Sequence, residues 1–495
     1  MKPTMQTASH HTSEEKPKRR VAFVVDLGFQ EILSIPILSA IAKARGHATE
    51  LFVAGRNLKK LTAQVAAFAP DIVAYSVCSN EVDRYLQINR FLKEHLRVFS
   101  LFGGAHPTFF PEFVETNGVD AICRGEADLC FAEFLDRFGT DEMYGVSNFA
   151  FERLDGRITA NPLADLVEDL DALPVPDRDL LYAKDAFMAR SPIKTFMAGR
   201  GCPYNCSYCY NHVHHAMYRG KGKILRTKSV GYLLDEIRGV GERHPLTFIR
   251  FLDDIFGMNR AWLAEFADRY PTEIGLPFTC YARPNMATEA WCEQVRKAGC
   301  YSVYMAIECG NERLRNSVAN RGISDEQIEA ACRNLQRYGI RIATFNMVGM
   351  PGETEGEMLE TVDLNHRLGV DLAVGSVCQP YPGTALNQYC KERGYLDESA
   401  DRFESPHTQT VLKLPEELKQ KIYVVHKLFP MLVDHPKLKG VMRALYRADF
   451  LNGLLTVLSK VYYGRNIHKR IYDSQIPWGL RLRGALGMLA SKSRS

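Results

Sequence analysis

The chain has 495 residues, of which 46% are hydrophobic, 24% charged and 10% aromatic, and 62 Lys and Arg against 58 Asp and Glu give a net charge of +4. This composition is that of a folded protein of about three domains of ~150 residues, and it excludes wholesale disorder, collagen-like repeats and a small disulfide scaffold. The charge bias is too weak to indicate nucleic acid. No uninterrupted apolar run approaches the ~20 residues of a membrane span.

The first 20 residues are polar and contain no apolar segment before Val21. We expect them to be a disordered lead-in without a secretory signal. Thirteen cysteines, an odd number, indicate reduced thiols and a cytoplasmic protein. Most are expected to pack as small buried hydrophobes, including Cys280, Cys292, Cys300, Cys332, Cys378 and Cys390.

Residues 21–150 alternate short apolar runs with helical patterns. The expected strands are Val21–Asp26, Thr49–Val53, Ile72–Ser76, Val98–Phe102 and Ala121–Cys123, and the expected helices lie at Ile37–Arg45, Leu58–Phe68 and Asp83–Leu96. This alternation predicts a doubly wound parallel sheet, a fold that binds ligands at the carboxyl ends of its strands.

Residues 151–187 are predicted to be a linker, since the prolines within Leu173–Asp177 can continue neither a helix nor a central strand. A second βα series occupies residues 188–410. Its expected strands are Ile193–Ala198, Thr247–Leu252, Phe278–Arg283, Ser302–Glu308, Arg341–Val348 and Leu372–Gln379, with helices such as Glu289–Ala298, Asp325–Tyr338 and Glu355–Leu368. Six such units predict a partial (βα)6 barrel rather than a second open sheet. Residues 411–495 read as a helical region, with helices at Glu416–Leu432 and Lys437–Val461.

Three cysteines follow the first strand of this second series directly. Cys202, Cys206 and Cys209 have the spacing C-x3-C-x2-C, with Tyr208 before the third. Three thiols can converge on one soft metal centre. A structural zinc site takes four ligands, whereas a 4Fe-4S cluster held by three thiolates keeps one iron open for a substrate or cofactor. The alternative is zinc with His212, His214 or His215 as the fourth ligand.

This spacing resembles the signature of the radical S-adenosylmethionine (SAM) superfamily, and the resemblance extends over residues 188–410. The matching segments are Phe251–Phe256, Met305–Gly310, Met347–Thr354 and Tyr381–Thr384, with Ala306 and Cys309 departing from the usual Gly and Ser. The resemblance implies that the three cysteines bind the cluster. It also implies SAM contacts from Tyr208 near the adenine, Asp254 at the methionine amino group, Glu308 at the ribose, and the Val348–Gly349 backbone at the adenine. The alternatives are an acidic strand-end loop for Asp254 and a salt bridge of Glu308 with Arg283 or Arg341.

The N-terminal segment resembles the cobalamin-binding domain of cobalamin-dependent radical SAM enzymes. The matching residues lie in Gly103–Thr108 and Val119–Glu126, and the implied cobalamin contacts are Gly103, Gly104, His106, Thr108 and Gly125. Adjacent glycines would let backbone approach a ligand without interference from a Cβ atom. The chain lacks the Asp-x-His-x-x-Gly motif that inserts a histidine under cobalt, so we expect no histidine ligand to cobalt. The alternatives are that His106 bonds its own loop, and that the sheet has lost its cofactor.

Together the domains resemble radical SAM methyltransferases that use methylcobalamin. The resemblance implies that SAM cleavage yields a 5′-deoxyadenosyl radical, which abstracts hydrogen from an unactivated carbon of a small-molecule or lipid-like substrate, and that methylcobalamin supplies the methyl group. An electron donor such as flavodoxin or ferredoxin would reduce the cluster. One alternative is a cobalamin-dependent radical SAM cyclase without methyl transfer, and another is a non-catalytic cobalamin-binding sensor. No catalytic side chain is singled out.

The C-terminal region alternates basic and apolar residues. From Lys437 to Arg494 it has twelve Lys or Arg against two acids, interleaved with apolar residues spaced mostly by three and four. This pattern predicts amphipathic helices. They would either cap the open barrel or rest peripherally on an anionic membrane surface.

Overall fold

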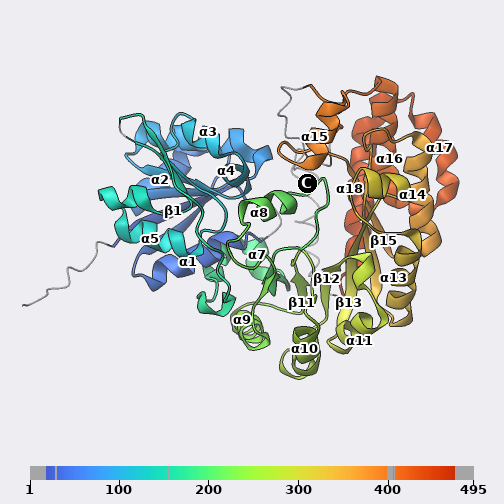
Figure 1. Ribbon diagram of the computed structural model, residues 1–495, viewed down its shortest axis with the longest axis horizontal. Helices are drawn as coiled ribbons and strands as arrows, with labels where there is room; N and C mark the ends of the chain where they lie inside the picture. The colour runs from blue at the N-terminus through green and yellow to red at the C-terminus, as the bar shows by residue number, and fades with distance from the viewer. Residues whose placement is uncertain are drawn as a thin grey trace, which may run out of the picture.

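The computed structural model describes residues 18–27, 31–153, 155–397, 405, 407 and 409–473. Most of the expected lead-in and the final 22 residues of the C-terminal region lie outside these ranges. The described chain forms an N-terminal sheet domain, a curled second sheet and a set of C-terminal helices, seen from left to right in Figure 1.

The N-terminal sheet has seven strands in the order β2-β1-β3-β4-β5-β6-β7, of which the first five are parallel and the last two antiparallel. The strands are β1 Arg20–Val25, β2 Ala48–Val53, β3 Ile72–Ser76, β4 Phe99–Gly103, β5 Ala121–Cys123, β6 Phe149–Glu152 and β7 Ile158–Ala160. The helices are α1 Ser34–Ala44, α2 Leu58–Phe68, α3 Val82–His95, α4 Ala105–Phe109 and α5 Asp128–Arg137. Val21–Val25 is buried along its length because helices cover both faces. The doubly wound fold is confirmed.

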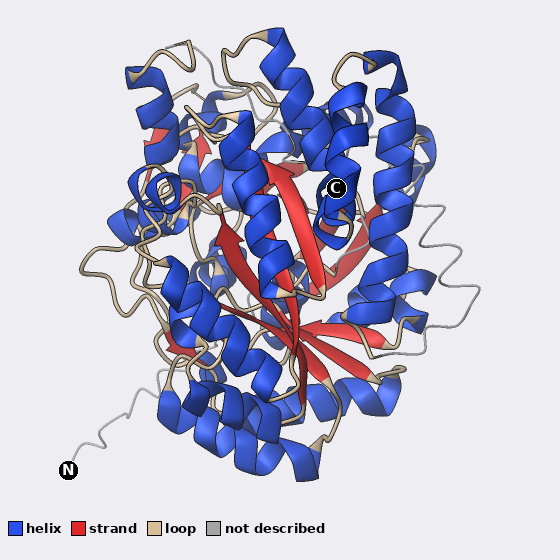
Figure 2. Ribbon diagram, turned by 90° about the vertical axis from the view of Figure 1, so that its right-hand side faces the viewer, coloured by secondary structure: helices blue, strands red, loops and turns tan. Residues whose placement is uncertain are grey.

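The second sheet has six parallel strands in the order β15-β14-β13-β12-β11-β8, and Figure 2 shows it curling into an open barrel with helices outside. The strands are β8 Ile193–Phe196, β11 Phe248–Phe251, β12 Phe278–Ala282, β13 Cys300–Glu308, β14 Arg341–Val348 and β15 Leu372–Val377. The helices are α8 Asn211–Met217, α9 Val230–Arg243, α10 Arg260–Glu273, α11 Glu289–Lys297, α12 Glu312–Ser317, α13 Asp325–Arg337, α14 Glu355–Leu368 and α15 Ala385–Glu392. The partial barrel is confirmed.

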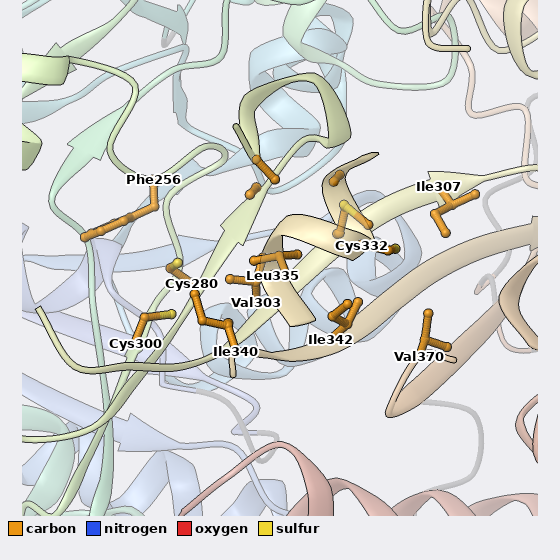
Figure 3. Close-up of a cluster of buried hydrophobic side chains, with 14 of the residues drawn as sticks. Phe256, Cys280, Cys300, Val303, Ile307, Cys332, Leu335, Ile340, Ile342 and Val370 are labelled. Atoms are coloured by element: carbon orange, nitrogen blue, oxygen red, sulfur yellow. The ribbon is translucent and has the colours of Figure 1, made fainter. Parts of the chain in front are cut away.

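Several cysteines are ordinary members of the barrel core. Cys280, Cys300 and Cys332 lie among Val303, Leu335 and other aliphatic side chains, as Figure 3 shows. Cys292, Cys378 and Cys390 are likewise buried. Burial raises the pKa of Cys332 to about 12, which keeps its thiol neutral and unreactive.

The segment between the two sheets is structured. It contains β7, which completes the first sheet, and the short helices α6 Arg178–Tyr182 and α7 Ala186–Arg190. Arg178 is buried and bonds Glu236 of α9 at 2.9 Å. The segment therefore ties the sheet domain to the barrel.

The C-terminal helices pack on the barrel edge at β15. They are α16 Glu416–Asp434, α17 Lys439–Leu445 and α18 Asn452–Arg470. The single helix expected at Lys437–Val461 is wrong: α17 ends at Leu445 and α18 begins at Asn452, with Asp449, Asn452 and Gly453, residues of low helix propensity, at the junction. Directly after α18, Ile471 and Tyr472 pack among buried strand residues such as Tyr304 and Leu372. No helix in the described ranges is long and apolar enough to cross a bilayer.

The remaining short elements are a two-stranded ribbon and single turns of 3-10 helix. The ribbon pairs β9 Gly199–Arg200 with β10 Arg226–Thr227. The turns are η1 Ser79–Glu81, η2 Pro111–Glu115, η3 Asp141–Gly145, η4 Leu170–Ala172, η5 Pro284–Met286, η6 Pro436–Leu438 and η7 Asp449–Leu451.

Candidate functional site

The cysteine loop leaves the barrel through a tightly packed ribbon. A Cβ atom at Gly199 would lie 2.5 Å from the Arg226 carbonyl, so glycine is needed for the ribbon to close. Asp253, buried after β11, accepts hydrogen bonds from the backbone N–H groups of Ala198 at 3.0 Å and Gly199 at 2.6 Å. Burial raises the pKa of Asp253 to about 7, against the opposing effect of these amides. The loop therefore starts from a fixed position.

The three predicted cluster ligands lie in this loop. Cys206 is buried, whereas Cys202 and Cys209 are partly exposed. Burial raises the pKa of Cys202 and also that of Cys209, the latter to about 11, and proximity to the other thiols adds to both effects. Thiolate formation here needs a nearby positive charge, which a bound metal supplies. The donor set therefore fits an iron–sulfur cluster.

The three histidines of the zinc alternative lie on α8, directly after the cysteines. His215 lies 2.6 Å from the Cys202 carbonyl through Nε2, and the Nε2 of His212 accepts the Ala385 N–H at 3.2 Å. Two of the three candidate fourth ligands therefore already bond other groups. In a 4Fe-4S cluster each thiolate binds a separate iron, so the three thiols need not converge on a single ion.

A buried network links the loop to the barrel interior. The Tyr208 hydroxyl donates to Glu308 at 2.8 Å, while Arg321 donates to the Tyr208 hydroxyl at 3.1 Å and to the Cys206 sulfur at 3.3 Å. Burial raises the pKa of Glu308, opposed by Arg321 and Tyr208. Arg321 carries no motif signal and was missed by sequence reasoning.

The alternative reading of Glu308 as a partner of Arg283 or Arg341 is wrong. Arg283 stacks on the Tyr204 ring at 3.7 Å, and Arg341 pairs with Asp371 at 2.7 Å. Glu308 also has a φ of 71°, which a non-glycine residue adopts only when its surroundings hold it there. Its carboxylate is thus directed into the barrel beside Tyr208.

The other predicted SAM contacts lie at the same strand ends. Asp254 is exposed and accepts a weak hydrogen bond from Asn211 of α8 at 3.4 Å. The Gly349 N–H donates to the buried Glu353 at 2.6 Å, and the Val348 carbonyl accepts the Cys378 N–H at 2.9 Å. The Gly349 amide and the Val348 carbonyl are therefore already hydrogen-bonded within the chain.

The predicted cobalamin turn connects β4 to α4. An added Cβ at Gly103 would have no neighbour nearer than 3.9 Å, so the space there is open. At Gly104 it would lie 2.6 Å from the Val77 nitrogen, so this glycine serves contact with its own sheet rather than with a ligand. His106 lies 3.0 Å from Ser79 and packs between Phe110 and Phe113. The turn thus fits a cofactor that needs no histidine ligand.

Thr108 links this turn to the loop after β5. Its hydroxyl donates to the Gly104 carbonyl at 2.7 Å and accepts the Gly125 N–H at 2.9 Å. A Cβ atom at Gly125 would overlap the Tyr218 hydroxyl at 1.9 Å, so glycine here admits a side chain from the barrel domain. The predicted cobalamin residues therefore form one connected edge.

The two domains are locked together at this edge. Glu126 accepts hydrogen bonds from Arg226 at 2.5 and 2.8 Å and from Arg200 at 2.9 Å, while Asp128 pairs with Arg200 at 2.6 Å. Burial would raise the pKa of Glu126, but the two arginines outweigh it and lower the pKa. Both arginines belong to the ribbon that carries the cysteine loop.

A ring contact joins the two predicted cofactor sites directly. The ring of Phe109, next to Thr108, stacks on Tyr210, next to Cys209, with centroids 4.3 Å apart. Figure 1 shows α8, which follows the cysteines, between the two domains. The carboxyl edge of the first sheet thus faces the cysteine loop.

Comparison with known proteins agrees with this architecture. Residues 197–364 match the Radical SAM superfamily model, and residues 22–135 match the B12 binding domain model. The chain is a cobalamin-dependent radical SAM enzyme. Its cofactors are accordingly a 4Fe-4S cluster, SAM and cobalamin.

Three relatives illustrate the range of this family. An uncharacterized methyltransferase of Pyrococcus horikoshii is 28% identical over 331 residues, 66% of this chain and 70% of the relative. The anaerobic magnesium-protoporphyrin IX monomethyl ester cyclase of Rubrivivax gelatinosus is 26% identical over 375 residues, 72% and 65% of the two chains. The structure of the cobalamin-dependent radical enzyme OxsB with aqua-cobalamin and SAM superimposes with a TM-score of 0.67 at 15% identity, covering 95% of this chain and 79% of that one. That likeness shows the fold.

Proposed function

We propose that this enzyme methylates an unactivated carbon of a small-molecule or lipid-like substrate. The observation that carries the proposal is the Phe109–Tyr210 stack, since it brings the edge that would hold cobalamin against the loop that would hold the cluster. A methyl donor and a radical source at one interface can act on the same carbon. The methyltransferase of Pyrococcus horikoshii supports methyl transfer over other outcomes.

The bound cofactors supply the radical and the methyl group, and the side chains supply their placement. Cys202, Cys206 and Cys209 would bind three irons. Tyr208 and Glu308, joined at 2.8 Å, would contact the adenosine part of SAM, with Asp254 at its amino group and the Val348–Gly349 turn alongside. An electron donor such as a flavodoxin or ferredoxin would deliver the reducing electron.

On the N-terminal side, Gly103, His106 and Thr108 would face cobalamin, while Gly104 and Gly125 would shape the same edge by allowing close contact with Val77 and Tyr218. Because His106 faces Ser79 at 3.0 Å, it would leave cobalt without a protein nitrogen ligand. Bound cobalamin would supply the methyl group, and the residues of this edge would position it. The proposed domains remain 21–150 for cobalamin, 188–410 for the radical core and 411–495 for the helical region.

Ring formation without methyl transfer is the second candidate, favoured by the similarity to the cyclase. Product mass separates the two. The reconstituted, dithionite-reduced enzyme should be incubated anaerobically with methyl-labelled SAM and an extract of the producing cells. A labelled product heavier by one CH2 supports the proposal, and a new product without label supports the cyclase. Failure to form 5′-deoxyadenosine would instead indicate a non-catalytic cobalamin-binding protein.

A further inference from the structure

The outward face of the last two helices is apolar. Six of the ten large hydrophobic side chains that are exposed in the described ranges lie between residues 441 and 461. They are Val441 at 58% exposure, Phe450 at 81%, Leu454 at 55%, Val457 at 46%, Leu458 at 46% and Val461 at 54%. We call these six residues the outer stripe. Such a concentration of exposed apolar surface marks an interaction site rather than ordinary surface variation.

The outer stripe is not needed to hold the helices on the barrel. Met442, Leu455 and Ile467 on the same helices are buried in the barrel cores. Leu454, Leu458 and Val461 are spaced by four and three, so they share the opposite side of α18. In Figure 1, α17 lies at the edge of the molecule away from the N-terminal domain, whereas α18 lies between α16 and the barrel sheet, both of which it contacts.

Basic residues extend the stripe at both ends. Residues 437–470 contain eight Lys or Arg and one acid, Asp449. On α18 the positions that continue the face beyond Val461 are Arg465 and Lys469, both exposed. On the α17 side, Lys437 and Arg447 are exposed. An apolar strip flanked by positive charge is complementary to a surface with an apolar interior and an anionic boundary.

We propose that the outer stripe docks on an anionic lipid bilayer, with Phe450, Leu454, Leu458 and Val461 entering the headgroup–acyl boundary. No helix in the described part can span a bilayer, so the contact would be interfacial. A second copy of the chain is disfavoured as the occupant. A two-fold contact through the stripe would bring basic residues together whether the two α18 helices run parallel or antiparallel, since exposed Lys or Arg flank the stripe on both sides.

Docking in this way would fix the position of the carboxyl ends of the barrel strands relative to the bilayer. The N-terminal part of α18 contacts α16 through Tyr423 and Asn452, and Ile422 of α16 covers Gly349 at the carboxyl end of β14. Phe450, the most exposed residue of the stripe, precedes α18 at this same end. The bilayer would therefore run along α18, at the side of the barrel, and reach the end of the barrel where its cofactors would bind.

The test is flotation of the full chain with phosphatidylcholine vesicles, with and without phosphatidylglycerol, at low and high salt. The intact protein should float with the anionic vesicles at low salt and less at high salt, because salt screens exposed charges over ~10 Å at 0.1 M. Phe450→Ser/Leu454→Ser/Leu458→Ser should lower binding at least about tenfold. Leu129→Ser, at a residue 63% exposed on α5 of the other domain, is the matched control and should bind like the wild type.

A second variant keeps the test valid if the first one misfolds. Arg465→Glu/Lys469→Glu should weaken binding to anionic vesicles and reduce its salt dependence, even if the triple serine variant does not fold. The proposal is overturned if the intact protein stays off anionic vesicles at low salt, or if both variants bind like the wild type. It is also overturned if light scattering shows a dimer that the triple variant abolishes, since the stripe would then join two copies.

Discussion

Glu126→Gln should loosen the contact between the two domains without unfolding either one. The wild-type carboxylate receives three hydrogen bonds from Arg226 and Arg200 across the domain boundary. Glutamine keeps the size of the side chain but loses its charge. Arg226, whose side chain is 2% exposed, then keeps the Val167 carbonyl at 3.0 Å but has a neutral amide oxygen in place of its carboxylate partner.

The size of the effect follows from burial. Removing one partner of a buried ion pair costs about 3–5 kcal/mol, because the remaining charge stays buried without compensation. The Glu126 side chain is 18% exposed and Arg200 keeps Asp128 at 2.6 Å, so we expect about 2–3 kcal/mol. That corresponds to roughly a 30- to 150-fold weaker closed state.

Differential scanning calorimetry and limited proteolysis measure this change. The variant should unfold in two separated steps and be cut faster between the domains, while cobalamin binding and 5′-deoxyadenosine formation continue and methylated product per 5′-deoxyadenosine falls. Glu133→Gln breaks only a surface pair with Arg137 and is the matched control. Because the pKa of Glu126 is lowered on folding, its contribution is present above 4.5 and is lost as the pH falls below that value. If Glu126→Gln matches Glu133→Gln in every measurement at neutral pH, the bonds of Glu126 with Arg200 and Arg226 do not hold the two domains together, and the reasoning is refuted.

Three further outcomes are expected. The electron paramagnetic resonance spectrum of the cobalt(II) form should lack superhyperfine splitting from a protein nitrogen, and splitting that disappears in His106→Ala would contradict the placement of His106 at Ser79. Gly104→Ala should destabilise the N-terminal domain by about 1–3 kcal/mol in chemical denaturation, because its Cβ would lie 2.6 Å from the Val77 nitrogen, and an unchanged midpoint would count against that packing. Arg321→Gln should make the cluster harder to reduce, because a cationic donor to Cys206 stabilises the reduced form; a potentiometric titration showing an unchanged or higher potential would exclude this role.

Sequence patterns predicted the elements better than the contacts between them. The strands Ile72–Ser76 and Arg341–Val348 coincide with β3 and β14, because short stretches rich in apolar, β-branched and aromatic residues are typical of buried parallel strands. The spacing of the three cysteines likewise predicts the cluster loop. By contrast, Arg321 meets Cys206 across 115 residues of sequence, and a contact over that separation leaves no local pattern.

Two glycines have structural causes that the sequence did not predict. Gly104 was expected to let backbone approach a ligand and Gly125 to contact cobalamin, yet an added Cβ would meet Val77 at Gly104 and Tyr218 at Gly125. Glu126 stood inside a segment matched to the cobalamin domain, but its partners Arg200 and Arg226 lie 74 and 100 residues away. Pairing across domains depends on how the domains dock, which the periodicity of neither one contains.

The measurement that tests the central claim most directly is 5′-deoxyadenosine formation by Cys206→Ala, beside wild type and Cys78→Ala, after anaerobic reconstitution with cluster and cobalamin. Cys206 is buried in the loop that would hold the cluster, whereas Cys78 is exposed in the N-terminal domain and serves as the matched control. Cys206→Ala should form no 5′-deoxyadenosine and still bind cobalamin, and Cys78→Ala should behave as wild type. Full 5′-deoxyadenosine formation by Cys206→Ala would contradict the account.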